Sequence, residues 1–124
     1  MNLKKVNRAL ISVSDKSELT KILKVLKKFK VEILSSGGTY KKINRLGYKS
    51  IEISDFTNSP EILDGRVKTL HPKLYGGILF KRNNKKHQKQ IKKINIKKID
   101  LVIVNFYPFE EAVKTGNDKK IIEN

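Results

Sequence analysis

The stretch Val31-Glu32-Ile33-Leu34-Ser35-Ser36-Gly37-Gly38-Thr39 decides the fold. Its apolar half predicts a short strand over 31–34, and the serines and glycines that follow predict a turn. A helix is expected over 40–46, and Gly47 is well placed to end it. A strand that leads through a glycine turn into a helix is typical of a parallel sheet covered by helices.

The flanking segments continue this alternation. Residues 8–13 are mostly apolar and predict a strand buried on both faces, and residues 49–53 predict a third strand. Between the first two strands, residues 14–18 offer several types that favour a helix N-cap. Apolar residues then recur at helical spacing, at Leu19, Ile22, Leu23, Leu26 and Phe29. We therefore expect an α/β three-layer sandwich with a mostly parallel sheet, which is a Rossmann-like architecture.

The second half of the chain is less regular. We expect a long loop over 54–75 with one helical turn near 61–63, then a strand or a buried helical turn over 76–80. A charged helix or loop is expected over 83–93. Residues 99–106 predict the strongest strand, which Pro108 would end, and residues 110–113 and 118–123 predict helices. The chain 1–124 is expected to form one domain that is truncated at its C-terminus.

The composition excludes several classes of site and favours an anionic ligand. There is no cysteine, which excludes disulfides, thiolate metal sites and cysteine nucleophiles. No apolar run approaches the ~20 residues of a membrane span, so we expect a cytosolic protein without a membrane partner. The net charge is +16, but lysine outnumbers arginine 24 to 4 and no basic stretch is interleaved with aromatic residues. A nucleic-acid partner is therefore disfavoured, and the charge suits steering of a small anion.

Polar residues follow three of the expected strands, where parallel α/β sheets bind ligands. They lie at 12–16, 35–39 and 105–108. The Ser-Ser-Gly-Gly-Thr turn suits a phosphate, because glycines let the backbone approach closely and a helix N-terminus favours anions. The same turn also fits a well-capped passage from strand to helix. Taken alone, Ser14-Asp15-Lys16 favours a helix cap over an anion site.

A fourth segment, Gly65-Arg66-Val67-Lys68-Thr69-Leu70-His71-Pro72, is more specific. Arg66 and Lys68 are two residues apart, so an extended backbone would point both cations in one direction, towards a phosphate or an oxyanion. The alternative is a solvated basic loop. His71 and His87 are far apart in the sequence and no cysteine is present, so no metal site is expected.

Four strings occur in order: Ser12-Val13-Ser14-Asp15-Lys16, Ser36-Gly37-Gly38-Thr39, Gly65-Arg66-Val67-Lys68-Thr69-Leu70-His71-Pro72 and Asn105-Phe106-Tyr107-Pro108-Phe109. Together they resemble the N-terminal domain of the bifunctional family that combines aminoimidazole-carboxamide ribonucleotide (AICAR) transformylase with inosine monophosphate (IMP) cyclohydrolase. The resemblance implies a methylglyoxal-synthase-like fold. It also implies closure of the formylated AICAR nucleotide to IMP with loss of water, in de novo purine biosynthesis.

The resemblance also assigns roles to individual residues. Lys68 and Tyr107 are the implied catalytic residues. The implied substrate-binding residues are Ser12, Ser14, Lys16, Ser36, Gly37, Gly38, Thr39, Arg66, Thr69 and Asn105. The cyclohydrolase step needs no cofactor, whereas a formyl-folate would serve only the transformylase domain, which is absent here. The full-length protein is expected to be a homodimer. The family continues beyond the position of Asn124 with further site residues, so the alternative is a non-catalytic or regulatory module that binds nucleotide or phosphate.

Overall fold

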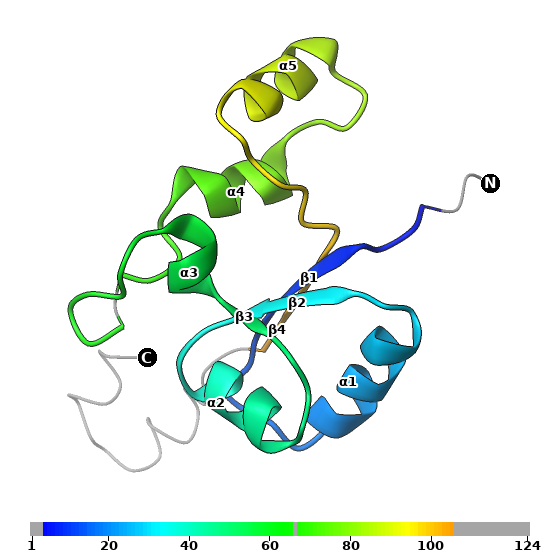
Figure 1. The fold of residues 1–124 in the computed structure, drawn as a ribbon, viewed down its shortest axis with the longest axis vertical. Coiled ribbons are helices and arrows are strands. Elements are labelled where there is room, and N and C mark those ends of the chain that lie inside the picture. Colours follow the sequence, from blue (N-terminus) through cyan, green and yellow to red (C-terminus); the bar gives the residue numbers. More distant parts are fainter. Residues whose placement is uncertain (1–3, 66, 106–124) are drawn as a thin grey trace.

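The computed structural model describes residues 4–65 and 67–105, and within them four strands form one parallel sheet (Figure 1). The strands are β1 (Arg8–Ser12), β2 (Glu32–Ser35), β3 (Ile51–Glu52) and β4 (Leu101–Val104), in the spatial order β3-β2-β1-β4. All three pairings are parallel, and Leu10 lies opposite Leu34 on one side and Val102 on the other. The expected α/β sandwich is confirmed.

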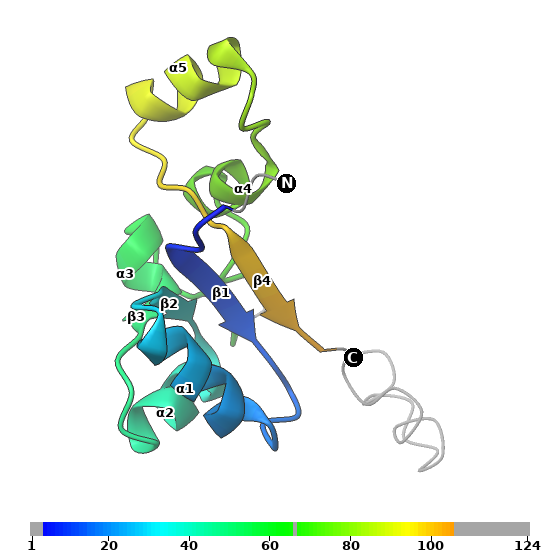
Figure 2. The same ribbon diagram turned by 90° about the vertical axis from the view of Figure 1, so that its right-hand side faces the viewer.

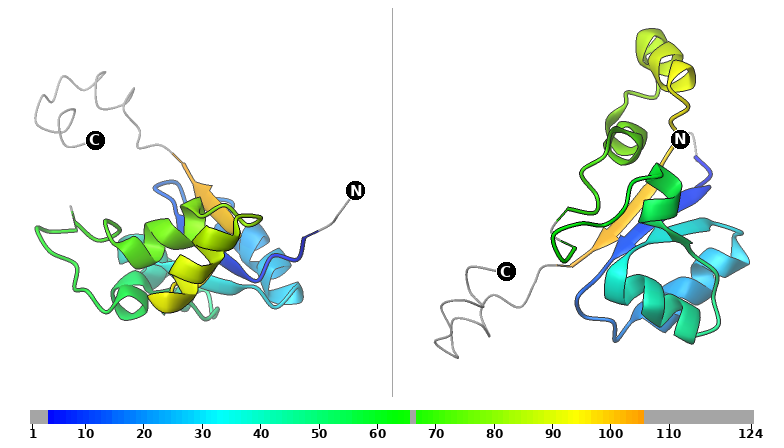
Figure 3. Two further views of the ribbon diagram at one scale, coloured as in Figure 1. Left: turned by 90° about the horizontal axis from the view of Figure 1, so that it is seen from above. Right: turned by 60° about the vertical axis from the view of Figure 1, so that its left-hand side comes forward.

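Helices cover both faces of this sheet. Helices α1 (Leu19–Lys28) and α2 (Gly37–Arg45) lie on one face, and α3 (Ile53–Thr57) and α4 (Pro72–Leu79) lie on the other (Figures 1 and 3). Helix α5 (Lys85–Lys93) lies beyond α4, away from the sheet (Figure 2). The layered part of the domain therefore contains α1 to α4, and α5 is an appendage to it.

The alternation of side chains along β1 explains why this strand is apolar on both faces. Ala9 and Ile11 pack with Leu23 of α1 and Ile43 of α2. Leu10 points the other way and packs with residues of α3 and α4, Ile53 and Leu74 among them. Because successive strand residues point to opposite faces, a central strand between two helical layers needs apolar residues at every position.

The structure corrects several sequence-based expectations. The loop expected over 54–75 contains most of α3 and the start of α4, whereas the helical alternative for 76–80 is confirmed, because most of these residues belong to α4. The expected helical turn at 61–63 is absent, because Ile62 forms an antiparallel bridge with Val67 instead. Helix α2 begins at Gly37, three residues early, because the glycine turn is itself the first turn of the helix. The helix alternative for 83–93 is confirmed.

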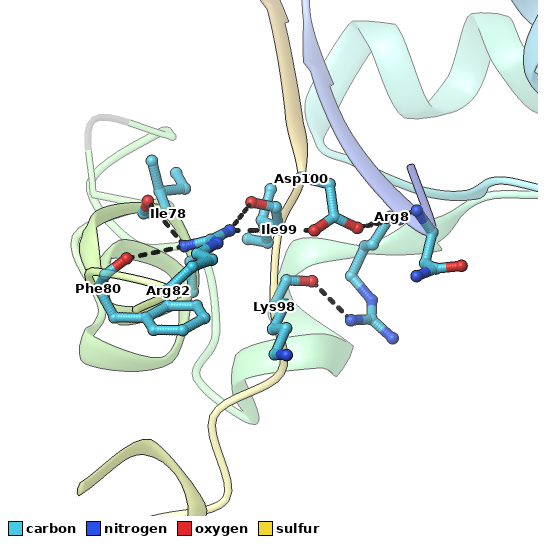
Figure 4. Close-up of polar contacts among 9 residues, drawn as sticks. Arg8, Ile78, Phe80, Arg82, Lys98, Ile99 and Asp100 are labelled. Carbon is cyan, nitrogen blue, oxygen red and sulfur yellow. Dashed lines mark hydrogen bonds and ion pairs between the residues drawn. The ribbon is translucent and has the colours of Figure 1, made fainter. Parts of the chain in front are cut away.

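An arginine joins the end of α4 to the start of β4 (Figure 4). The Arg82 guanidinium donates hydrogen bonds to four backbone carbonyls, those of Gly77, Ile78, Phe80 and Ile99, over 2.7–3.3 Å. It also lies 3.9 Å from the Asp100 carboxylate, which accepts from the amides of Asn7 and Arg8 at the start of β1. We call this arrangement the Arg82 clasp. It fixes α4 against the amino ends of β1 and β4, which are neighbours in the sheet.

A glycine lets α4 approach the segment before β4 closely. Gly77 is buried, and its carbonyl accepts a hydrogen bond of 3.0 Å from the amide of Ile99. A Cβ atom at position 77 would lie 2.4 Å from the carbonyl oxygen of Lys97. Any side chain at this position would therefore push α4 away from the sheet.

Candidate anion-binding site at the carboxyl ends of the strands

The chain reverses its direction of travel across the sheet at β1. It passes from β1 outward to β2 and β3, and then returns to place β4 on the other side of β1. In open α/β sheets, ligands bind beyond the carboxyl ends of the strands at such a switch point. Three of the polar segments singled out in the sequence follow β1, β2 and β4, so the topology brings them to the same edge of the sheet.

The glycine turn after β2 presents backbone N–H groups. Ser36 occupies the N-cap position of α2 in an extended conformation, and no side chain caps the helix. Gly37 has a φ of 56°, which is the left-handed region, and the helical residues follow directly. A left-handed residue followed by right-handed ones turns successive amides towards a common concavity. The turn therefore has the geometry of an anion-binding helix N-terminus.

Two lysines from different segments reach this turn. A Cβ atom built at Gly37 would lie 3.5 Å from Lys68 Nζ, and one at Gly38 would lie 3.8 Å from Lys16 Nζ. Within residues 4–65 and 67–105, neither ammonium forms an ion pair with a carboxylate. The two ammonium groups repel each other, and the positive end of the helix dipole repels both of them. A bound anion would offset these repulsions.

The loop after β1 is held in place by hydrogen bonds to its backbone. Lys16 Nζ donates to the carbonyls of Val13 at 2.9 Å and Ser14 at 3.2 Å. An ammonium has three donors, so Lys16 can keep both bonds and still donate to a ligand. The buried Thr39 hydroxyl accepts from the Val13 amide at 3.2 Å and donates to the Val13 carbonyl at 3.1 Å. Thr39 thus ties the first turn of α2 to the end of β1.

Replacing Thr39 with valine should therefore lower the free energy of unfolding by about 2 kcal/mol, because the buried Val13 amide would lose its partner and the Val13 carbonyl would keep only the bond from Lys16. Chemical denaturation of the wild-type and variant chains would measure this change. Thr39→Ser keeps the hydroxyl and serves as the control, with most of the stability retained. A valine variant as stable as wild type would contradict the proposed link.

Asn105 holds the same loop from the side of β4. Its Oδ1 accepts from the amide of Ser14 at 2.7 Å and from the Ser14 hydroxyl at 3.0 Å, and its Nδ2 donates to the Asp15 carbonyl at 3.0 Å. The Asp15 carboxylate accepts from the Ser17 amide at 2.9 Å, and this hydrogen bonding lowers the pKa of Asp15. In this structure Asn105 therefore positions the loop that carries Lys16.

The structure gathers many of the residues singled out in the sequence, but not all of them. Lys16, Gly37, Gly38 and Lys68 converge, while Ser12 is half-buried at the end of β1. Thr69 follows Lys68, and its carbonyl accepts from the His71 amide. Arg66 and Tyr107 lie outside the described residues. The sequence did not single out Asp15 for the turn it forms with Ser17, although an acid two residues before a serine is a usual pattern for such a turn.

Two cavities among the described residues are lined by neither Lys16 nor Lys68. A cavity of about 210 Å³ lies next to the loop after β1, with Val13, Asp15 and Asn105 among its lining residues. A larger one of about 570 Å³ lies between α4 and α5. The described residues bring together no group of three His, Asp or Glu side chains that could hold a metal ion. None of their helices is long and apolar enough to cross a membrane.

A known protein family matches most of this chain. The model of the MGS-like domain matches residues 18–124. This range includes the glycine turn, Lys68 and helices α1 to α5, whereas β1 and Lys16 precede it. The chain belongs to the MGS-like domain family. The match covers the larger part of the described fold.

Relatives of this MGS-like domain are considerably longer proteins. The chain is 50% identical over 112 residues to the bifunctional purine biosynthesis protein PurH of Ruminiclostridium cellulolyticum. This match covers 90% of the chain and 22% of that protein. It is 50% identical over 121 residues to PurH of Lactobacillus acidophilus, with 96% and 24% covered. The crystal structure of ForH matches with a TM-score of 0.73 and 31% identity, covering 82% of this chain and 53% of that one. The MGS-like domain thus spans about a fifth of the PurH proteins it matches.

Proposed function

We propose that this MGS-like domain binds a phosphorylated nucleotide and contributes the IMP cyclohydrolase step, closing the formylated AICAR nucleotide to IMP. The observation that carries the proposal is the convergence of Lys16 and Lys68 on the Gly37-Gly38 turn. The PurH names of relatives at 50% identity support the choice of a purine nucleotide. Reaction in the cytosol, by a homodimer of a longer parent protein, is part of the same proposal.

The phosphate of the nucleotide would occupy the first turn of α2. Backbone amides at a helix N-terminus donate to phosphate oxygens, and the helix dipole adds to the attraction. Lys16 would supply a charged donor from the loop after β1, which Thr39 and Asn105 hold in place. Ser36 and Gly37 have no side-chain cap to displace, so the turn is already shaped for an anion.

Lys68 would serve the chemistry as well as the binding. In the ring closure, the carboxamide nitrogen attacks the formyl carbon, and negative charge develops on the formyl oxygen before water leaves. A positioned ammonium stabilises that charge and can donate a proton to the departing oxygen. Both reacting groups belong to one molecule, so holding them in a reactive geometry supplies much of the acceleration and requires no cofactor. Arg66, Thr69 and Tyr107 stay predictions for the surroundings of the base.

The proposal is tested by adding the formylated AICAR nucleotide to the full chain and following IMP by chromatography, with nucleotide binding measured by calorimetry on the same sample. Formation of IMP above the uncatalysed rate supports the proposed activity. Saturable binding of IMP without turnover would overturn the catalytic part and identify a nucleotide-binding module. Absence of both would overturn the proposal.

A further inference from the structure

Helix α5 lies apart from the layered domain. Figures 1 and 2 show it beyond α4, on the side of the molecule away from α1 and α2. Only Ile91 of its nine residues is buried. An isolated helix of this length is only marginally stable in water, so its packing against neighbours has to hold it. Within the described residues, that packing is thin.

The space between α4 and α5 is an apolar groove. Its volume is about 570 Å³, and its lining includes Leu79, Phe80, Ile91, Ile94 and Ile96. Leu79 is 71% exposed and Ile94 is 55% exposed. Large apolar side chains gathered at the rim of a concave site indicate a binding surface, whereas single apolar residues spread over a surface do not. We call it the α4–α5 groove.

The chain around the α4–α5 groove is strongly cationic. Residues 70–99 contain ten Lys and Arg residues and no Asp or Glu, whereas the rest of the chain contains 18 cations and 12 acids. The segment therefore carries +10 of the net charge of +16. The Arg82 clasp engages one of these cations inside the domain, and the other nine are lysines. Lys93 itself lines the groove.

We propose that the α4–α5 groove binds an acidic amphipathic helix of a partner protein. Its apolar face would bury Leu79 and Ile94, and its Asp and Glu residues would face the surrounding lysines. A second copy of this chain is a poor occupant, because a symmetric contact would bring two segments of +10 together. A flat lipid surface fits poorly, because the apolar residues line a hollow between two helices.

The position of the groove leaves the candidate nucleotide site open. The Arg82 clasp places the C-terminal end of α4 beside Ile99 and Asp100, at the amino ends of the strands. The converging lysines lie beyond the carboxyl ends. A docked helix would therefore occupy the opposite end of the sheet from the nucleotide, and both could be bound together.

The test uses the full chain and a designed 18-residue helical peptide with leucines on one face and glutamates on the other, labelled for fluorescence anisotropy. Two further peptides have the same composition in scrambled order, or lysine in place of glutamate. We expect saturable binding of the designed peptide and at least tenfold weaker binding of both others. Equal binding of the scrambled peptide would overturn the proposal, because it would show simple charge attraction. Absence of binding would overturn it as well.

Variants of exposed side chains locate the contact without disturbing the core. Leu79→Ser and Ile94→Ser should each weaken binding about tenfold, because each removes apolar area that the peptide would bury. Phe29→Ser is the matched control, since Phe29 is 60% exposed at the C-cap of α1, and it should bind like wild type. Circular dichroism would confirm that each variant is folded. Equal losses in Phe29→Ser would overturn the assignment to the groove.

Two outcomes would identify a different occupant and overturn the proposal. One is a dimer of the chain, seen by light scattering, that Leu79→Ser dissociates. The other is binding to phosphatidylglycerol vesicles that Leu79→Ser abolishes while the designed peptide does not compete. If the designed peptide displaces the chain from the vesicles and the chain stays monomeric, the result supports the acidic helix as occupant.

Discussion

Replacing Lys68 with alanine is expected to lower kcat for IMP formation by about 100- to 1000-fold, the usual effect of removing a group that stabilises developing charge. KM should rise by a smaller factor, because Lys16 and the amides of the Gly37-Gly38 turn would still hold the phosphate. Steady-state kinetics with the formylated AICAR nucleotide separate the two parameters. A change in KM alone would show that Lys68 serves only the phosphate.

Lys41→Ala provides the control for Lys68→Ala. Lys41 is exposed on α2, the helix that begins at the glycine turn, and its replacement changes the net charge by the same amount. Wild-type kinetics in this variant would exclude a general effect of charge on steering. Full turnover in Lys68→Ala would remove the catalytic assignment, whatever the control shows.

Gly77→Ala is expected to lower the free energy of unfolding by about 3 kcal/mol, at the upper end of the usual effect of overpacking a core. The added Cβ would lie 2.4 Å from the carbonyl oxygen of Lys97, and backbone cannot move aside as the end of a side chain can. The hydrogen bond from Ile99 to Gly77 would be strained by the same displacement. Thermal unfolding should show a melting temperature lower by roughly 10 °C.

Gly47→Ala separates the steric effect from the general effect of replacing a glycine. Gly47 has a φ of 86° but nothing within 4 Å of a Cβ atom, so its replacement should cost only about 1 kcal/mol for the left-handed backbone. A loss in Gly77→Ala no greater than in Gly47→Ala would show that α4 can move away from the sheet cheaply.

The sequence predicted the fold where local pattern and tertiary role agree. Residues 8–13 and 31–34 are short, mostly apolar runs, and such runs favour a strand between two layers. Helix α4 was predicted only as one of two alternatives over 76–80, because Pro72, Gly76 and Gly77 occupy three of its eight positions. Its helical form depends on the close approach at Gly77 and on the Arg82 clasp. Neither of these contacts can be predicted from the local sequence.

The candidate site was predicted only in part, because one of its contacts depends on the path of a loop. The segments after β1 and β2 could be placed together, because parallel strands end at the same edge of a sheet. The approach of Lys68 to Gly37 depends on the path of the loop between α3 and α4, which has weak periodicity. One signal was overlooked. With 4 arginines against 24 lysines, each arginine stands out, and Arg8 and Arg82 both make structural hydrogen bonds.

The order of the strands has a consequence for synthesis of the chain. Strand β1 lies between β2 and β4, and the contact of Asn7 with Asp100 spans 93 residues. β3 ends at Glu52 and β4 ends at Val104, so the ribosome needs roughly 3 to 10 s to add the intervening residues at ~5–20 residues per second. During that interval the nascent chain can pair β1 with β2 only. One apolar edge of its central strand therefore stays open to other strands until β4 emerges.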